Sequence, residues 1–374
     1  MLTGALGIRI LLLVGDAVPL PAPPDVTAAL RKAEVTCDAD GGDGFQLTFA
    51  LARDAVVDYS IVLRGALSPF KRVTVALLMG ALPEVLIDGV ITHQQLTPGE
   101  EPGSATLTVT GKDVSVMLDL EEKSEEFPNQ PDFLIAGRTL APYARYGMVP
   151  QVTPTADIPL MIQRIPRQHE TDLALLKRLA DRNGFVFYVE PVTLGVTRAY
   201  FGPENRLGIP QSALTLDMGA ASNVRGMHFS HDGMAAVQAE AKIIEPITKA
   251  QIPIPAVPAL KLPPLAPIPS LARRKAITRE TANAGPAQAI LSVLSAATRA
   301  PDPVTAEGEM DTTRYGHVLR ARRLVGVRGA GFTYNGLYYV RRVTHSIDVQ
   351  ASSYTQRFSL SREGTGSLLP VLVP

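Results

Sequence analysis

The sequence predicts a mainly β protein with an inserted mixed α/β segment. Runs in which apolar and polar residues alternate dominate the first part of the chain, as in FQLTFALA and TLTVTG. The same texture returns near the end in YGHVLRARRLVGVRG and GLYYVRRVTHSID. Between them, an amphipathic helix pattern leads into the strand-like FVFYVE. This order is typical of two β regions separated by an α/β region.

Changes in this pattern divide the chain into five parts. They are a first β domain (1–111), an inserted α/β domain (112–205), a second β domain (206–242 and 306–364), a proline-rich arm with a short helix (243–305) and an apolar C-terminal tail (365–374). The short helix is expected over GPAQAILSVLSAATRAP, where Pro286 suits the first turn and Pro301 lies just past the end.

Composition limits the function classes. The 374 residues are 46% hydrophobic and 19% charged, with a formal net charge of +0, which gives no support to nucleic-acid binding. Cys37 is the only cysteine, so an intramolecular disulfide and a cysteine metal cluster are excluded, and assembly in a reducing compartment is expected. The apolar core Ile10–Val14 of IRILLLVG is too short to span a bilayer, and we expect a buried first strand of a soluble chain without a cleaved leader or membrane insertion.

The stretch RQHETDLALLKRLADRNGFVFYVE, residues 167–190, raises the question of a metal or acid/base site. A zinc-protease helix needs a second histidine four residues after the first, but Leu173 stands four residues after His169. Nucleophile-elbow, phosphate-loop and dinucleotide-binding fingerprints are absent from the sequence, and no cofactor or metal is expected. The acidic run 121–126 is interpreted as a solvated face, because nothing apolar there would raise a carboxyl pKa.

The stretch is better explained as the start of a helix. Thr171 is a good N-cap, Glu170 and Asp172 place negative charge at the positive end of the helix dipole, and Gly184 ends the helix. The predicted apolar face consists of Leu173, Leu176, Leu179 and Ala180. His169 is expected to pack or hydrogen-bond locally.

The segment 245–275 contains eight prolines between Pro246 and Pro269, interleaved with Ile, Val, Leu and Ala. Proline fixes φ and removes a donor, so this segment is predicted to be extended and to be neither helix nor central strand. Its apolar residues predict that it packs on a neighbouring subunit or domain. The tail SLLPVLVP is predicted to dock on a spike or an adjacent subunit for the same reason.

Three stretches, in order, resemble the phage late control protein D family, the baseplate hubs of contractile tails and the hub portion of type VI secretion spike proteins. They are TVTGKDVSVMLDLEEKS with RTLAPYARYGM, HETDLALLKRLADRNGFVFYVE, and YGHVLRARRLVGVRGAGFTYNGLYYVRRVTHSID with YTQRFSLSREG. The resemblance covers nearly the whole chain except the proline-rich arm.

The resemblance implies a homotrimeric ring in which each subunit gives two similar tube-like β-barrel domains and an inserted α/β domain. Such a ring adapts a three-fold central spike to the six-fold inner tube and initiates tube assembly beside other baseplate components. Because the chain ends after SREGTGSLLPVLVP, the spike is expected to be a separate protein. The expected setting is a phage tail, a tailocin or an extracellular contractile injection system, assembled in the bacterial cytoplasm and carried in a virion or injection particle.

Two other function classes remain as alternatives to this structural, non-enzymatic role. One is a baseplate-associated cell-wall hydrolase with Glu121, Glu125 or Asp132 as its acids. The other is a channel that guides nucleic acid, suggested by the arginines at 314, 320, 322, 323, 328, 341 and 342. These arginines lie in predicted strands, so many are expected to be solvated edge or inter-subunit residues, and no specific nucleic acid is predicted as a partner.

An internal echo suggests that the two β domains are duplicated. IDGVITH and GLYYVRRVTH each precede a turn and a strand that ends in glycine, at Gly111 and at Gly364. The echo predicts that His93 and His345 occupy equivalent strand positions and are structural. Two similar domains in each of three subunits would give six near-equivalent positions.

Overall fold

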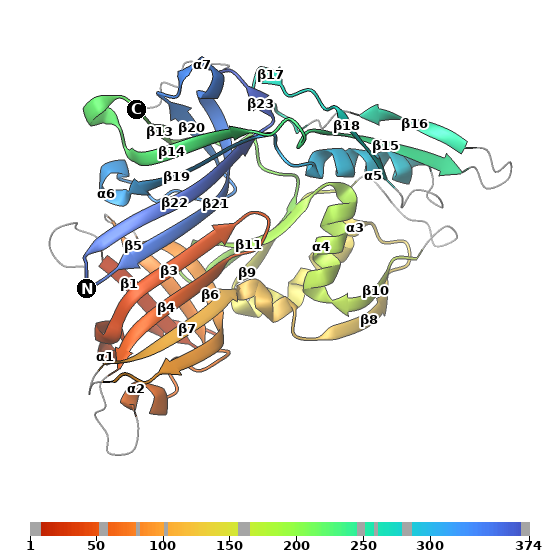
Figure 1. Cartoon of the computed structure of the whole chain (residues 1–374). Helices are drawn as coiled ribbons and strands as arrows, with labels where there is room; N and C mark the ends of the chain where they lie inside the picture. Colours follow the sequence, from red (N-terminus) through yellow and green to blue (C-terminus); the bar gives the residue numbers. More distant parts are fainter. Residues whose placement is uncertain are drawn as a thin grey trace.

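The computed structural model describes residues 9–51, 59–79, 83–100, 104–155, 165–244, 251–257, 261–278 and 286–367. Its main feature is a 13-stranded, mostly antiparallel sheet that runs through both β regions of the chain, with the α/β part beside it (Figure 1). Helices within these ranges are all too short or too polar to cross a membrane.

The first β unit has the strand order β1-β5-β6-β7-β4-β3, and the short β2 lies beside β1. Its elements are β1 (Arg9–Gly15), β2 (Leu20–Pro21), α1 (Pro24–Ala29), β3 (Leu30–Asp38), β4 (Gly44–Leu51), α2 (Ser60–Leu63), β5 (Arg72–Leu78), β6 (Pro83–Thr97) and β7 (Ala105–Asp113). Along β4, Phe45, Leu47 and Phe49 are buried and alternate with outward-facing residues, because successive strand side chains point to opposite faces. Leu12 and Leu13 are buried on β1, where the sequence predicts a buried first strand.

The second β unit has the order β13-β20-β21-β22-β19-β14, which repeats that of the first unit strand for strand. Its elements are β13 (Gln211–Thr215), η3 (Gly219–Ala221), β14 (Val224–His231), β19 (Val304–Asp311), α6 (Thr312–Tyr315), β20 (Leu324–Arg328), α7 (Gly331–Tyr334), β21 (Gly336–Asp348) and β22 (Ser353–Arg362). All pairings among the last five strands of each order are antiparallel. Only the first strand differs, since β1 is antiparallel to β5 whereas β13 is parallel to β20.

Hydrogen bonds align the two units residue by residue. The N–H of Phe70 donates to the carbonyl of Ile91 on β6 at 2.8 Å, and the N–H of Arg322 donates to the carbonyl of Val340 on β21 at 2.8 Å. Both donors have positive φ, 66° and 62°, a backbone conformation that is uncommon outside glycine. Phe70 therefore corresponds to Arg322, and Ile91 corresponds to Val340.

A β-bulge follows at the next residue of each unit, at Thr92 and at Arg341. His93 directly follows the first bulge, and Arg342 directly follows the second, so these two residues correspond. The sequence similarity that aligned His93 with His345 is therefore wrong by three residues. Strand pairing, and not local sequence similarity, fixes the alignment of the two units. Their surroundings also differ: His93 is exposed, whereas His345 is buried.

The two units are joined into one sheet by β3 and β21. The segment Lys32–Asp38 pairs antiparallel with Arg342–Asp348. One hydrophobic core then runs through both units, and it includes Val35 of the first unit together with Val343 and Ile347 of the second. The halves of the sheet are thus fixed to each other by backbone pairing and by shared burial.

The α/β part lies between the two β units in the sequence. Its elements are η1 (Val114–Leu118), β8 (Glu122–Glu126), α3 (Asp132–Leu140), η2 (Ala141–Tyr146), β9 (Met148–Val152), β10 (Arg167–Thr171), α4 (Asp172–Asn183), β11 (Val186–Thr193) and β12 (Val196–Gly202). Strands β11, β12 and β9 form one small sheet, and β8 pairs with β10. Both helices contribute to a separate core, in which Ile135 and Leu176 are fully buried.

The proline-rich segment folds back on its own chain, which corrects the expectation of a continuous polyproline-type arm. Strand β16 (Gln251–Val257) pairs with β15 (Val237–Ile244), which also pairs with β18 (Arg274–Thr278). Because β16 lies at the edge of this small sheet, its prolines remove no hydrogen bond from a second neighbour. Further along, the two-residue β17 (Ile268–Pro269) pairs with β23 (Gly364–Thr365), and Leu265 packs on the second β unit.

The helix predicted after this segment is α5 (Pro286–Arg299). Its C-terminal half contacts α4, and the side chain of Ser295 donates to the carbonyl of Asp181 at 2.7 Å. The segment 243–305, called the insertion below, is thereby attached to the α/β part. Of the predicted C-terminal tail, residues 368–374 lie outside the described residues.

Candidate functional site: two buried ionic junctions

The motif at 167–190 forms β10, α4 and β11. The Thr171 hydroxyl oxygen accepts from the N–H of Ala174 at 3.3 Å, and Gly184 has a φ of 66° directly after the helix. Glu170 lies 2.6 Å from Arg178, outside the helix start. The buried face consists of Leu175, Leu176, Leu179 and Ala180, with Leu173 only half-buried. Leu175 is the one member that the sequence pattern did not assign to this face.

Asp172 has a larger role than a charge at a helix terminus. Its buried carboxylate accepts from Lys123 Nζ at 2.6 Å, from the Tyr143 hydroxyl at 2.8 Å and from Gln168 Nε2 at 2.8 Å. These donors belong to β8, η2 and β10, so one carboxylate fixes three elements around the start of α4. Such charge-assisted bonds are stronger than neutral ones and suit a structural anchor.

Of the three acids of the hydrolase alternative, two have structural partners and the third is exposed. Glu125 is exposed on β8, 3.6 Å from Arg138. Asp132 is buried at the start of α3 and accepts from Arg182 and from Asn183 at the end of α4. Glu121 is exposed. Within the described ranges no group of three or more His, Cys, Asp or Glu side chains could hold a metal ion.

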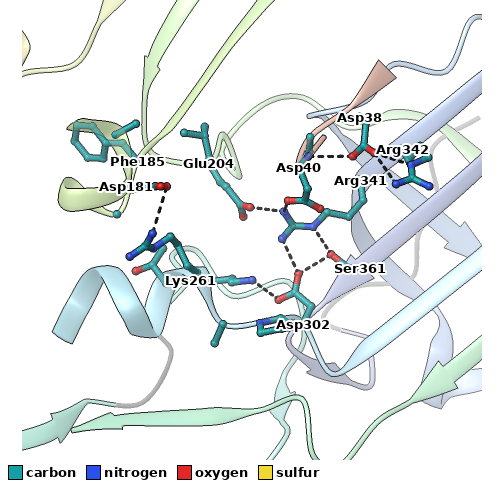
Figure 2. A pocket seen from close by; sticks show the side chains of 18 of the residues that line it. Asp38, Asp40, Asp181, Phe185, Glu204, Lys261, Asp302, Arg341, Arg342 and Ser361 are labelled. Atoms are coloured by element: carbon teal, nitrogen blue, oxygen red, sulfur yellow. Dashed lines mark hydrogen bonds and ion pairs between the residues drawn. The ribbon is translucent and has the colours of Figure 1, made fainter. Parts of the chain in front are cut away.

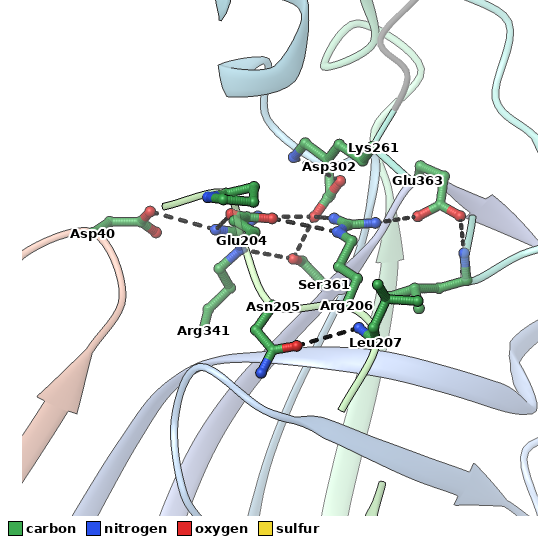
Figure 3. Close-up of polar contacts among 12 residues, drawn as sticks. Asp40, Glu204, Asn205, Arg206, Leu207, Lys261, Asp302, Arg341, Ser361 and Glu363 are labelled. Carbon is green, nitrogen blue, oxygen red and sulfur yellow. Dashed lines mark hydrogen bonds and ion pairs between the residues drawn. The ribbon is translucent and has the colours of Figure 1, made fainter. Parts of the chain in front are cut away.

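The first ionic junction is centred on Asp302, just before β19 (Figure 3). Its carboxylate accepts from Lys261 Nζ at 2.9 Å, from Arg341 at 3.1 Å, from Arg206 at 3.4 Å and from the Ser361 hydroxyl at 2.6 Å. Lys261 comes from the insertion, Arg206 follows the α/β part, and the other two lie on β21 and β22. We call this cluster the Asp302 junction.

Charges in the Asp302 junction balance. The cations are Arg206, Lys261 and Arg341, and the carboxylates are Glu204, Asp302 and Glu363. Burial alone would raise the pKa of the Asp302 carboxyl, but the charges of Lys261, Arg341 and Arg206 outweigh it and hold that pKa below its ordinary value. A carboxylate stabilised in this way is a weak base, so the cluster is suited to holding parts together and not to proton transfer.

A mixed-charge cavity of about 690 Å³ opens beside this junction (Figure 2). Asp181 and Phe185 of the α/β part line one side, and Arg341 and Arg342 of the second β unit line the other. Asp40, from the loop between β3 and β4, lies 3.5 Å from Arg341. The cavity therefore lies where the α/β part and both β units meet.

The second ionic junction is centred on Arg322, the residue with positive φ that precedes β20. Its guanidinium donates to Asp43 at 2.6 Å and 3.0 Å and to the carbonyl of Asp38 at 2.6 Å, and it lies 4.5 Å from the Tyr188 ring centre. Burial opposes the charge, but Asp43 outweighs it and raises the pKa of Arg322. This Arg322 junction connects the second β unit, the first β unit and β11 of the α/β part.

A buried carboxyl lies beside the Arg322 junction. Asp113, at the end of β7, accepts from the N–H of Asp43 at 3.3 Å and from the N–H of Ser115 at 2.7 Å. Burial and the negative charge of Asp43 raise the pKa of Asp113 to about 6. The protonation of Asp113 therefore changes around pH 6.

The arginines of the nucleic-acid alternative are only partly solvated. Arg314, Arg323 and Arg342 are exposed, and Arg342 also pairs with Asp38 at 2.6 Å, whereas Arg322 is buried and Arg341 is half-buried in the two junctions. The expectation that many would be solvated is wrong for Arg322 and Arg341, because their charges hold parts of this chain together. Arg320 and Arg328 likewise bond within the chain, to Glu84 and to Thr215.

Sequence reasoning missed the other members of the junctions. Arg206, Lys261 and Asp302 stand in loops far apart in the chain, and no fixed spacing connects them. Their one local signal is an isolated charge close to prolines, as in PDP around Asp302. That signal indicates a loop but not a partner.

The fold is similar to that of solved phage tail proteins. A tail protein from Neisseria meningitidis MC58 superposes with a TM-score of 0.62 at 15% identity, covering 96% of this chain and 98% of that chain. The 43 kDa tail protein of prophage MuSo2 from Shewanella oneidensis gives a TM-score of 0.63 at 17% identity, covering 95% of this chain and 98% of that one. No family model and no curated protein sequence matches this chain.

A component of the type VI secretion system of E. coli, described as structurally similar to the T4 tail proteins gp27 and gp5, has a TM-score of 0.56 at 14% identity. The match covers 92% of this chain and 77% of that chain. At these identities the likeness concerns the fold, and it extends over nearly the whole length of the chain. The chain thus has the fold of phage tail proteins and of a type VI secretion component.

Proposed function

We propose that this chain is a structural hub of a contractile injection machine, of the late control protein D type. Three copies would form a ring that receives a three-fold spike on one face and starts a six-fold inner tube on the other. The observation that carries this proposal is the internal repeat, since two β units share strand order, bulge positions and a positive-φ turn. Three such chains offer six near-equivalent units.

The fold likeness supports the same proposal. The similar structures are phage tail proteins and a type VI secretion component, and each match covers at least 92% of this chain. The described residues support a non-enzymatic role, because the charges of the two junctions are matched in ion pairs that connect the parts of the chain. A ring under mechanical load during contraction needs such connections more than a catalytic cleft.

The proposal is tested in particles. Deleting the gene should abolish tube and sheath assembly beyond the baseplate, and expression of the wild-type chain should restore it. Electron microscopy of intact particles should show three copies between spike and tube. Particles that assemble normally without the chain, or that contain one or six copies of it, would overturn the proposal.

The hydrolase alternative is tested by incubating the purified chain with cell-wall peptidoglycan. We expect no release of soluble fragments above the level given by a heat-inactivated sample. Release that depends on Glu125 or Asp132 would instead favour an enzyme.

A further inference from the structure

Among the strand edges without a partner strand in the described residues are those of β14 and of the end of β6. Strand β14 pairs only with β19, which leaves its other edge open. One edge of β6 pairs with β5 and with Phe70 and Lys71, which precede β5, and this pairing ends at Ile91. Residues 92–97 therefore pair with β7 on their other edge only. Open edges are templates for pairing with another strand.

The strands that correspond to them by the repeat, β3 and the second half of β21, are paired with each other. Strand β3 lies along the second half of β21, and β21 corresponds to β6. Strand β3 in turn corresponds to β14: each has a β-bulge at the equivalent place, at Arg31 and at Arg225. Asp38 and Asp232, at the ends of these strands, each accept from the N–H two residues further on, at 3.0 Å and 2.8 Å. The contact within the chain is therefore one instance of a contact that the repeat offers twice.

We infer that the second instance forms between copies, so that β14 of one copy pairs antiparallel with residues 92–97 of β6 of the next copy. This inference rests on the proposed ring and assigns its subunit interface. Carrying over the β3·β21 register sets Asp232 opposite His93, Ser230 opposite Gln95, and Phe229 opposite Leu96.

The chemistry of the opposed residues is complementary in the same way as in the contact within the chain. There, Arg342 lies 2.6 Å from Asp38 across the two strands. At the corresponding positions between copies, His93 faces Asp232, and both are exposed in the isolated chain. A cation-capable side chain and a carboxylate thus stand opposite each other in both contacts.

The next pairs also match. Thr36 and Thr344 share a side-chain hydrogen bond at 3.1 Å within the chain, and the corresponding pair between copies is two polar residues, Gln95 and Ser230. His345 is 1% exposed under β3, whereas its counterpart Leu96 is 41% exposed. The docking of β14 would cover this leucine with Phe229.

This contact is heterologous, because one copy contributes β14 and the other contributes β6. The second β unit of each chain would then pair with the first β unit of the next chain. The first β unit pairs with the second in the same way within one chain. A heterologous contact closes a ring when its rotation is a whole fraction of a turn, which for three copies is one third. The pairing would make the sheet continuous around the ring and leave neither edge open.

Paired cysteines test this interface. In the contact within the chain, Ala39 donates to the carbonyl of Arg341, so Thr36 and Thr344 form a non-hydrogen-bonded pair. Such pairs have Cα atoms about 4.5 Å apart, within reach of a disulfide. The variant Gln95→Cys with Ser230→Cys should therefore give covalent dimers and trimers on a non-reducing gel after mild oxidation of the purified chain and of assembled particles.

Three matched variants complete the experiment. Thr36→Cys with Thr344→Cys has the same geometry within one chain and should give an intrachain bond without oligomers. Gln46→Cys with Ser230→Cys moves one thiol to an exposed central strand and should give less than one-tenth of the covalent oligomer. A mixture of the single variants Gln95→Cys and Ser230→Cys should stop at covalent dimers, which shows that the contact is heterologous.

Light scattering of the same samples separates the interface from the proposed function. A trimer in which Gln95→Cys with Ser230→Cys gives no more covalent product than the Gln46 control would overturn this register while the hub proposal stands. Absence of the covalent product in particles that contain three copies would overturn it in the same way. Particles that lack the chain would overturn the hub proposal itself.

Discussion

The last five strands of the two β units are paired alike, but the side chains at one pair of covered positions differ. Arg72 and Asp88 form a buried ion pair on β5 and β6 of the first unit, 2.7 Å apart. Counted from the aligned hydrogen bonds, Leu324 and Leu337 stand at the corresponding positions of the second unit. The comparison teaches that strand order, bulges and turns are set by backbone pairing, whereas either a matched ion pair or an apolar pair can fill the same place.

The segments that lie over these positions explain why their side chains differ between the two units. In the first unit, the carbonyl of Ala17 also accepts from Arg72 at 2.8 Å, so the loop between β1 and β2 is polar where it lies over the pair. In the second unit, Leu265 of the proline-rich segment packs on Leu324. In each unit, the side chains at these positions therefore match the segment that covers them.

The largest expected effect comes from breaking the ion pair of the first unit. Arg72→Leu alone should lower the free energy of unfolding by about 3–5 kcal/mol, because it leaves Asp88 buried without its partner. Arg72→Leu with Asp88→Leu, which copies the second unit, should recover most of this loss. Urea unfolding of the wild type and of both variants measures it. A double variant no more stable than the single one would show that the two positions are not interchangeable.

The next effect tests the shared positive-φ turn. Phe70→Gly relieves an unfavourable backbone conformation but adds flexibility to the unfolded chain, so the free energy of unfolding should change by less than about 1 kcal/mol. Arg322→Gly gains the same relief and loses the Asp43 ion pair, with an expected net loss of about 2–4 kcal/mol. Equal losses in the two variants would mean that the Arg322 junction contributes little.

A third test uses pH. Asp113 ends β7, and the corresponding residue of β22 is Arg362, so the first unit buries an acid where the second buries a base. The pKa of Asp113 is raised to about 6, so the folded protein binds a proton that the unfolded chain releases at lower pH. Stability contributed by this group is therefore lost as pH rises from about 4 to above 6.

Relative to wild type, the variant Asp113→Asn should consequently gain about 2 kcal/mol of stability as the pH rises from 4.5 to 7.5. The control Asp302→Asn should show no such gain, because the pKa of Asp302 is lowered and its ionised form is kept through this range. Chemical unfolding at both pH values measures the difference. A flat profile for Asp113→Asn would place the pKa of this carboxyl near its ordinary value.

The smallest effect is expected at the equivalent bulges. Arg225 pairs with Asp311 at 2.9 Å on the surface, so Arg225→Met should change the free energy of unfolding by less than about 1 kcal/mol. Arg31→Met, at the bulge of β3, should behave alike. A larger loss at either position would show that the bulge depends on its side chain and not on strand pairing alone.

Sequence pattern alone determined much of the local structure. Alternation along FQLTFALA and the cap and glycine around α4 predicted a strand and a helix, because these signals act between neighbours in the chain. Within its described residues, the proline-rich segment forms neither helix nor central strand, as predicted. Its return as β16 was not foreseen, since an edge strand accepts prolines on its open side.

Tertiary structure decided the register of the repeat and the members of the junctions. The letters around His93 and His345 suggested one alignment, but hydrogen bonds at Ile91 and Val340 fix another, three residues away. Asp302 meets its cations only after loops distant in the sequence come together. Strand pairing and burial join residues that are far apart in the sequence, so only the folded structure shows them. An isolated charge in a loop does not indicate which opposite charge it will meet.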